Sequence, residues 1–170
     1  FLNNILDLDS ASRIFSLVSE SARKNESPSN IPIFATFDFE TAFLSVIHSW
    51  IWMVLAYRTF GADFIRLFQG IYHDASAIFT HHNVKHVIMR FFSGALQGCP
   101  GSAFLFDNAL DPFLHLFHEK FRERNKGLVR ACADDIGTAL ARLKHLGVLH
   151  PILQVAKDHA GLFLKPPKCV

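Results

Sequence analysis

The stretch GLVRACADDIGTAL, residues 127–140, carries two adjacent carboxylates between two short apolar runs. Both runs contain residues that favour strands, and the acidic pair falls where the chain can turn. This pattern predicts two antiparallel strands joined by a tight turn, with Asp134 and Asp135 at the turn. Carboxylates at the rim of a buried hairpin are costly unless they are exposed, paired or bound to a cation.

A second apolar segment with an acid near its end lies upstream, IPIFATFDF at residues 31–39. It follows the polar loop 24–30 and predicts a buried strand that carries Asp38. We expect this strand to pair with the 127–140 hairpin in one antiparallel sheet, which would place Asp38 beside Asp134. Such a pair suits two hard ions such as Mg²⁺, about 3.5–4 Å apart. A plainer interpretation stays open, in which these acids only serve a strand end and a turn.

The rest of the chain predicts mostly helices and one more hairpin. Helices are expected over residues 4–24, 41–59, 62–72, 102–123 and 142–160, a hairpin over 75–80 and 84–92, a Gly-rich loop over 93–102 and an extended piece over 161–170. Pro112 is a point at which the fourth helix can bend, and Gly147 and Pro151 are expected to interrupt the last. Mixed order with antiparallel hairpins predicts an α+β fold, not a doubly wound parallel sheet.

Composition supports one folded domain. Half of the 170 residues are hydrophobic and 18 are Phe, which excludes a disordered tail. The net charge of +2 is small for a nucleic-acid binder. The charge is polarised, however, because residues 1–119 hold 7 basic and 11 acidic residues whereas residues 120–170 hold 10 and 4. The basic part suits a surface that faces a polyanion.

Cysteine usage and the first residues predict an intracellular protein. The three cysteines form no CxxC pair, so a disulfide framework is not expected. Residues 1–13 carry acids where a signal peptide needs a basic flank and an apolar run. We therefore expect a reducing compartment, the nucleus or the cytoplasm. Because the chain starts at Phe1 and its methionines are Met53 and Met89, we expect a fragment of a longer protein.

Two other classes of function stay open. The apolar stretch 43–57 could mark a membrane-associated protein, but it is shorter than the ~20 residues of a span and contains His48. We expect a buried helix there and no membrane partner. His82 and His86, four residues apart, could mark a zinc-binding module. No Glu follows the first of them, however, and the segment predicts a hairpin.

Four segments resemble, in order, the four palm motifs of reverse transcriptases. They are FDFETAF (37–43), SGALQGCPGSAFLF (93–106), ACADDIG (131–137) and GLFLKPPKC (161–169). The tetrapeptide QGCP and the opening residues 1–13 resemble the non-LTR, LINE-like branch. The resemblance implies an RNA-directed DNA polymerase of a retrotransposon polyprotein. It also implies a polymerase palm over residues 1–170, with an antiparallel sheet packed on helices and part of the fingers, but without the upstream fingers and the thumb.

The resemblance implies a set of catalytic residues. Asp38 and Asp134 would hold two Mg²⁺ ions (Mn²⁺ being the alternative), with Asp135 assisting. The backbone carbonyl of Phe39 would be a further oxygen ligand. Lys168 would be a cation near the phosphates and could protonate pyrophosphate, although one solvated lysine is an equally good account of it.

The resemblance also implies substrates and substrate contacts. Gln97 would hydrogen-bond in the nucleotide pocket, and Gly98 would permit close backbone approach. Phe43 would lie beneath the sugar and exclude a 2′-OH, unless its ring is only core packing. The implied partners are an RNA template, a DNA primer, a deoxynucleoside triphosphate, and the fingers, thumb and other domains of the same polyprotein.

Some residues depart from the family pattern. The usual Tyr before ADD is Cys132, the charged residue often found before QG is Leu96, and the usual Asn of the fourth motif is Lys165. Gly101–Ser102–Ala103 replaces the usual Leu-Ser-Pro. None of these changes removes a predicted metal ligand. An inactive relic of a retroelement stays open, and we expect the chain alone, without fingers and thumb, to polymerise little or nothing.

Overall fold

A three-stranded antiparallel sheet forms the centre of the computed structural model, which describes residues 16, 20, 27–122, 126–166 and 169. Its strands are β1 (Ile33–Phe37), β4 (Gly127–Cys132) and β5 (Asp135–Leu140), in the order β1-β5-β4. Phe37 pairs with Ile136 and Ile33 pairs with Leu140. The predicted pairing of the upstream strand with the 127–140 hairpin is therefore confirmed, and the α+β class with it.

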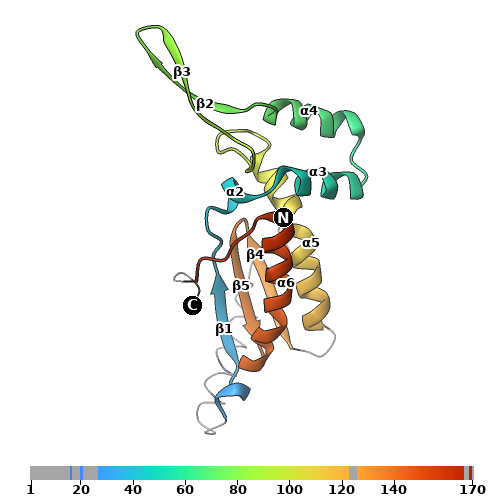
Figure 1. Ribbon diagram of the computed structural model, residues 1–170. Coiled ribbons are helices and arrows are strands. Elements are labelled where there is room, and N and C mark those ends of the chain that lie inside the picture. The colour runs from blue at the N-terminus through green and yellow to red at the C-terminus, as the bar shows by residue number, and fades with distance from the viewer. Residues whose placement is uncertain (1–15, 17–19, 21–26, 123–125, 167–168, 170) are drawn as a thin grey trace.

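Helices cover one face of this sheet and extend beyond one end of it (Figure 1). The α-helices are α2 (Ala42–Ser45), α3 (His48–Tyr57), α4 (Ala62–Tyr72), α5 (Ser102–Arg122) and α6 (Leu149–Val155). The short helical turns are η2 (Pro28–Asn30), η3 (Leu143–Val148) and the π-helical η4 (Ala156–Ala160), and a second hairpin consists of β2 (Ser76–His81) and β3 (Val84–Arg90). The predicted helix over 4–24 lies almost wholly outside the described residues.

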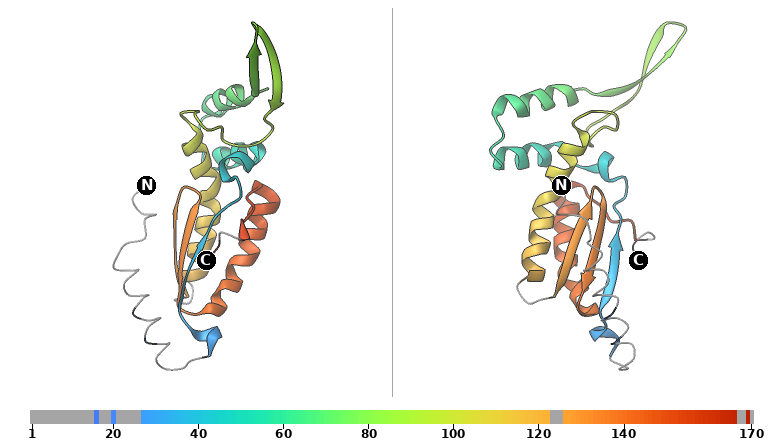
Figure 2. Two further views of the ribbon diagram at one scale, coloured as in Figure 1. Left: turned by 90° about the vertical axis from the view of Figure 1, so that its left-hand side faces the viewer. Right: turned by 180° about the vertical axis from the view of Figure 1, so that it is seen from behind.

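The long helix α5 supplies much of the core. Its apolar side packs on β4 and on α3, and four of its phenylalanines, Phe106, Phe113, Phe117 and Phe121, are almost completely buried. Pro112 lies inside this helix, which still runs without interruption to Arg122. Figure 2 shows α5 and α6 together on one face of the sheet. The end of β1 and the β4–β5 turn lie together at the end of the sheet nearest α2 (Figure 1).

The predicted helix over 41–59 was wrong in one respect, because the chain forms two helices there. Val46 has extended backbone angles, and its carbonyl accepts a hydrogen bond from the Gly94 amide at 2.7 Å. The amide of Ile47 donates to the carbonyl of Ala160 at 2.9 Å. These contacts, made with segments distant in sequence, satisfy the backbone groups that a continuous helix would otherwise have used.

The predicted interruption near Gly147 and Pro151 is a change of helix type and not a break. Residues 143–160 pass from a 3₁₀ turn through α6 into a π turn. Pro151 lies in the first turn of α6, where a missing N–H costs little. Gly161 then ends the run in the left-handed conformation and sends the chain back toward α2.

Replacing Gly161 with Ala should lower the free energy of unfolding by about 2 kcal/mol or more. Its φ is +73°, and a Cβ there would come within 2.5 Å of the Ser45 carbonyl oxygen. Gly147→Ala is the matched control, because a Cβ at that position meets nothing within 4 Å. Chemical denaturation of both variants measures the difference. Equal stabilities would contradict the close approach of Gly161 to Ser45.

Candidate active site

A cavity of about 270 Å³ opens where β1 ends beside the β4–β5 turn. Its lining residues come from four separate parts of the sequence and are Asp38, Phe39, Thr41, Ala42, Phe43, Leu44, Gln97, Asp134 and Lys165. Five of the predicted site residues are among them: Asp38, Phe39, Phe43, Gln97 and Asp134. The tertiary structure thus brings together Asp38 and Asp134, which are 96 positions apart in the chain, and Lys165, which is 127 positions from Asp38.

The backbone around Asp38 is held from both sides. Phe37, the preceding residue, pairs with Ile136 of β5. On the other side, the Lys165 amide donates to the Asp38 carbonyl at 2.9 Å, and Phe39 forms an antiparallel bridge with Leu164. The segment that ends the chain therefore extends the sheet beside Asp38. This arrangement fixes the half-buried Asp38 carboxyl at the cavity while the side chain of Phe39 enters the core.

Asp134 reaches the cavity from the turn of the second strand pair. Cys132 pairs with Asp135, so the connection between β4 and β5 contains only Ala133 and Asp134. Ala133 has φ +51°, the left-handed conformation that such short connections require. Asp134 is half-buried and lines the cavity, whereas Asp135 is exposed and does not line it.

A buried tyrosine anchors the loop that carries Gln97. The Leu96 amide donates to the Tyr72 hydroxyl at 3.2 Å, and the Ala95 amide donates to the Phe43 carbonyl at 2.6 Å. Burial raises the pKa of Tyr72 to about 12, so its hydroxyl stays neutral at physiological pH. Gln97 is thereby held at the rim of the cavity. Gly98, the next residue, has φ +92°, is exposed and is absent from the lining.

The ring of Phe43 has a packed side and a side toward the cavity. It stacks on the buried Phe106 ring with centroids 4.3 Å apart and planes inclined by 18°. It is also half-buried and lines the same cavity as Asp38 and Asp134. Core packing and contact with a ligand, the two interpretations of this residue, are therefore compatible.

The polar side chains of the cavity carry two carboxylates, one amide, one ammonium group and the Thr41 hydroxyl. Lys165 is the cation there, and sequence reasoning had assigned that role to Lys168, which lies outside the described residues. The signal available in the sequence was that Lys165 occupies a position where the family pattern has Asn. Two shifted pKa values belong to α5 and not to the cavity: burial raises the pKa of Asp107 and lowers that of His118, and Arg130 also lowers the latter.

The sequence matches the reverse transcriptase (RNA-dependent DNA polymerase) family over residues 3–170. The chain belongs to the reverse transcriptase family. A comparison with curated proteins gave no match. Similar solved structures show the fold independently. They include apo telomerase from Candida tropicalis truncated from its C-terminal domain (TM-score 0.70, 14% identity) and telomerase from Candida albicans in complex with a TWJ fragment of telomeric RNA (TM-score 0.71, 14% identity).

This reverse transcriptase domain spans about a third of those telomerase chains. The two matches cover 98% and 97% of this chain but only 35% and 31% of the telomerase chains. A further apo telomerase structure from Candida tropicalis gives a TM-score of 0.71 at 12% identity. The match covers 96% of this chain and 32% of that telomerase chain. The predicted polymerase palm, an antiparallel sheet packed on helices, is confirmed at the level of the fold.

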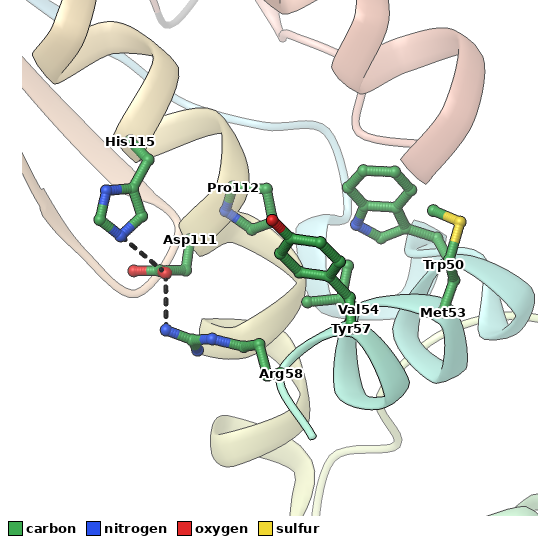
Figure 3. Close-up of a pocket in the computed structure, with 8 residues that line it drawn as sticks. All are labelled: Trp50, Met53, Val54, Tyr57, Arg58, Asp111, Pro112 and His115. Carbon is green, nitrogen blue, oxygen red and sulfur yellow. Dashed lines mark hydrogen bonds and ion pairs between the residues drawn. The ribbon is translucent and has the colours of Figure 1, made fainter. Parts of the chain in front are cut away.

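A second cavity of the reverse transcriptase domain, about 480 Å³, lies between α3 and α5 (Figure 3). Its walls are largely apolar, with Trp50 stacked on Phe113 at 5.0 Å. The charged groups at its rim pair with one another, because the Asp111 carboxylate accepts from Arg58 at 2.8 Å and lies 3.4 Å from His115. The cavity near Asp38 differs in offering two acids that converge on one space.

The structure also bears on the membrane-associated and the zinc-binding alternatives. No helix within the described part of the chain is long and apolar enough to cross a bilayer, and α3 has only ten residues. His82 lies in the turn of the β2–β3 hairpin and His86 in β3, so the predicted hairpin is confirmed. Over residues 27–122 and 126–166, no three His, Cys, Asp or Glu side chains lie close enough together to hold a metal ion by themselves.

Proposed function

We propose that this domain carries the active site of an RNA-directed DNA polymerase, which adds deoxynucleotides to a primer 3′-OH on an RNA template. One observation carries the proposal: Asp38 and Asp134, from separate family motifs, line one cavity together with Gln97 and Lys165. Carboxylates, an amide and a cation are the groups that a nucleoside triphosphate and its counter-ions require.

The donor set fits Mg²⁺, with Mn²⁺ as the alternative. Magnesium sites in phosphoryl-transfer enzymes use one or two carboxylates and complete their coordination with water and substrate phosphates. Asp38 and Asp134 would supply the carboxylates, Asp135 would assist from the neighbouring position, and the Phe39 carbonyl would add an oxygen. When bound, the metal supplies Lewis-acid charge neutralisation for the triphosphate and the primer oxygen. The scarcity of other acids in the cavity explains why substrate phosphates would be needed to complete the site.

The remaining residues of the cavity would orient the nucleotide. Gln97 would hydrogen-bond to it, and Gly98 would let the loop backbone approach. Lys165 would place a positive charge beside the phosphate oxygens, and Lys168 stays a predicted second cation. Phe43, held by Phe106 on its other side, would lie beneath the sugar and disfavour a 2′-OH.

The domain would act as part of a longer polyprotein. Its share of the telomerase chains leaves room for upstream fingers and a thumb, and the QGCP sequence favours a LINE-like retrotransposon as the source. The RNA fragment in the Candida albicans telomerase structure supports an RNA template as partner. We propose an intracellular site of action, in the nucleus or the cytoplasm, with this chain alone polymerising little or nothing.

The test is primer extension by the complete open reading frame from which this chain derives. A DNA primer annealed to RNA should be extended with deoxynucleotides when Mg²⁺ or Mn²⁺ is present, and the extension should stop when the template is omitted. Template-independent extension, or none with either metal in a folded protein that binds the primer–template, would contradict the proposal. The latter result would identify the chain as an inactive relic.

A further inference from the structure

The hairpin of β2 and β3 projects away from the rest of the domain (Figures 1 and 2). Its two strands form a separate two-stranded sheet, so both outer edges lack a paired strand among the described residues. Every residue of β3 is exposed. An isolated hairpin of this kind is only marginally stable in water, which favours a binding partner that covers it.

The charge of the hairpin has one sign. Residues 75–92 contain no Asp or Glu, but they contain Lys85, Arg90 and three histidines. Lys85 and Arg90 are exposed, and neither forms an ion pair with another residue of the described ranges. Outside residues 75–92 the chain carries 15 basic and 15 acidic residues, with the basic excess concentrated in residues 120–170. A protrusion with uncompensated positive charge complements a polyanion.

Exposed rings accompany this charge. The ring of Phe79 is 54% exposed and stacks along His81, with centroids 6.1 Å apart and planes inclined by 12°. Phe79 pairs across the hairpin with His86, so both side chains lie on one face. Thr80 pairs with Lys85 on the other face, and the ribbon is only about 5 Å wide between strands. A flexible polyanion that runs along the edge of the hairpin can therefore contact both the rings and the ammonium group of Lys85.

We propose that the β2–β3 hairpin binds single-stranded nucleic acid, with bases stacked on the Phe79–His81 face and phosphates contacting Lys85 and Arg90. Aromatic faces combined with cations are the usual surface for strands bound without sequence preference. The alternative occupant is a second copy of this chain, paired edge to edge. Symmetric pairing would bring two positively charged hairpins together, which disfavours it. This binding needs none of the cavity residues and goes beyond the proposed polymerase function.

The experiment measures binding of a labelled uridine homopolymer, which forms no duplex, by fluorescence anisotropy over a range of salt concentrations. The chain carrying both Lys85→Gln and Arg90→Gln should bind about tenfold more weakly at low salt. The slope of log affinity against log salt should shrink by about 1.4, since each lost phosphate contact removes about 0.7. Phe79→Ala should weaken binding about tenfold through lost stacking, without changing that slope.

A matched control removes the same charge elsewhere. Arg142→Gln with Lys144→Gln changes two exposed basic residues at the start of η3, at the opposite end of the sheet from the hairpin, and should weaken binding less than the hairpin pair does. The proposal is overturned if the control pair weakens binding as much as the hairpin pair. It is also overturned if the wild-type chain does not bind, or if the hairpin variants alter self-association in sedimentation but not RNA binding. The tenfold difference caused by the hairpin pair should persist when both chains also carry Asp134→Asn, which separates this test from that of the polymerase.

Discussion

Replacing Asp134 with Asn should lower the rate of primer extension by the complete polymerase by about a thousandfold or more. The substitution keeps the size of the side chain but removes a negative charge from a cavity in which Asp38 is the other acid. Phosphoryl transfer depends mainly on positioning and electrostatic stabilisation, so this charge acts directly on the barrier. A thousandfold loss corresponds to about 4 kcal/mol of transition-state stabilisation.

Folding should not suffer from this change. Asp134 lies in the β4–β5 turn and is half-buried, and its nearest acid in the cavity repels it in the absence of a cation. We therefore expect the melting temperature of Asp134→Asn to equal or exceed that of the wild type without metal. Extension rate and melting curve, measured on the same preparation, distinguish lost chemistry from lost structure.

Two control variants refine the result. Asp135→Asn alters the adjacent acid, which is exposed and does not line the cavity, and should cost less activity than Asp134→Asn. Asp158→Asn removes an exposed acid on η4 and should leave extension unchanged. If Asp134→Asn extends primers at the wild-type rate, the cavity is not the polymerase site. If Asp135→Asn loses more extension activity than Asp134→Asn, then Asp135 is the main metal-binding acid and Asp134 the assisting one.

Phe43→Ala should raise the use of ribonucleotides relative to deoxynucleotides by about ten- to a hundredfold. Its ring lines the cavity of Asp38 and Asp134 and is held from behind by Phe106 at 4.3 Å. A rigid ring discriminates against a 2′-OH by steric clash, so its removal opens the space for that hydroxyl. The lost stacking and burial should also lower stability by about 2 kcal/mol, less than for a fully buried Phe.

The measurement is the ratio of kcat/KM values for the two nucleotide types, together with a melting curve. Phe60→Ala is the control, because Phe60 is also half-buried and packs against Phe104 at 5.4 Å but does not line the cavity. It should lose stability and keep the sugar preference of the wild type. A Phe43→Ala enzyme that is destabilised with an unaltered ratio would show that this ring only packs the core.

Local patterns in the sequence were enough for most elements. The apolar runs on either side of the acidic pair predicted β4, β5 and the turn between them, and the predicted helix 62–72 coincides with α4. Side-chain alternation and turn residues act over a few neighbours, so they can be recognised without knowing the rest of the fold. The pairing of β1 with the hairpin could also be predicted, because strand-end acids indicated which ends should meet.

Only the tertiary structure decided the features that depend on distant partners. The break at Val46 arises because Gly94 and Ala160 satisfy backbone groups near it, and no local pattern records those contacts. Lys165 lies at the cavity because its backbone amide bonds to the Asp38 carbonyl. Asp135 does not line the cavity, because it pairs with Cys132 at the end of the two-residue turn. The sequence by itself determined which side chains could do the chemistry. The long-range hydrogen bonds of the fold determined which of them share one cavity.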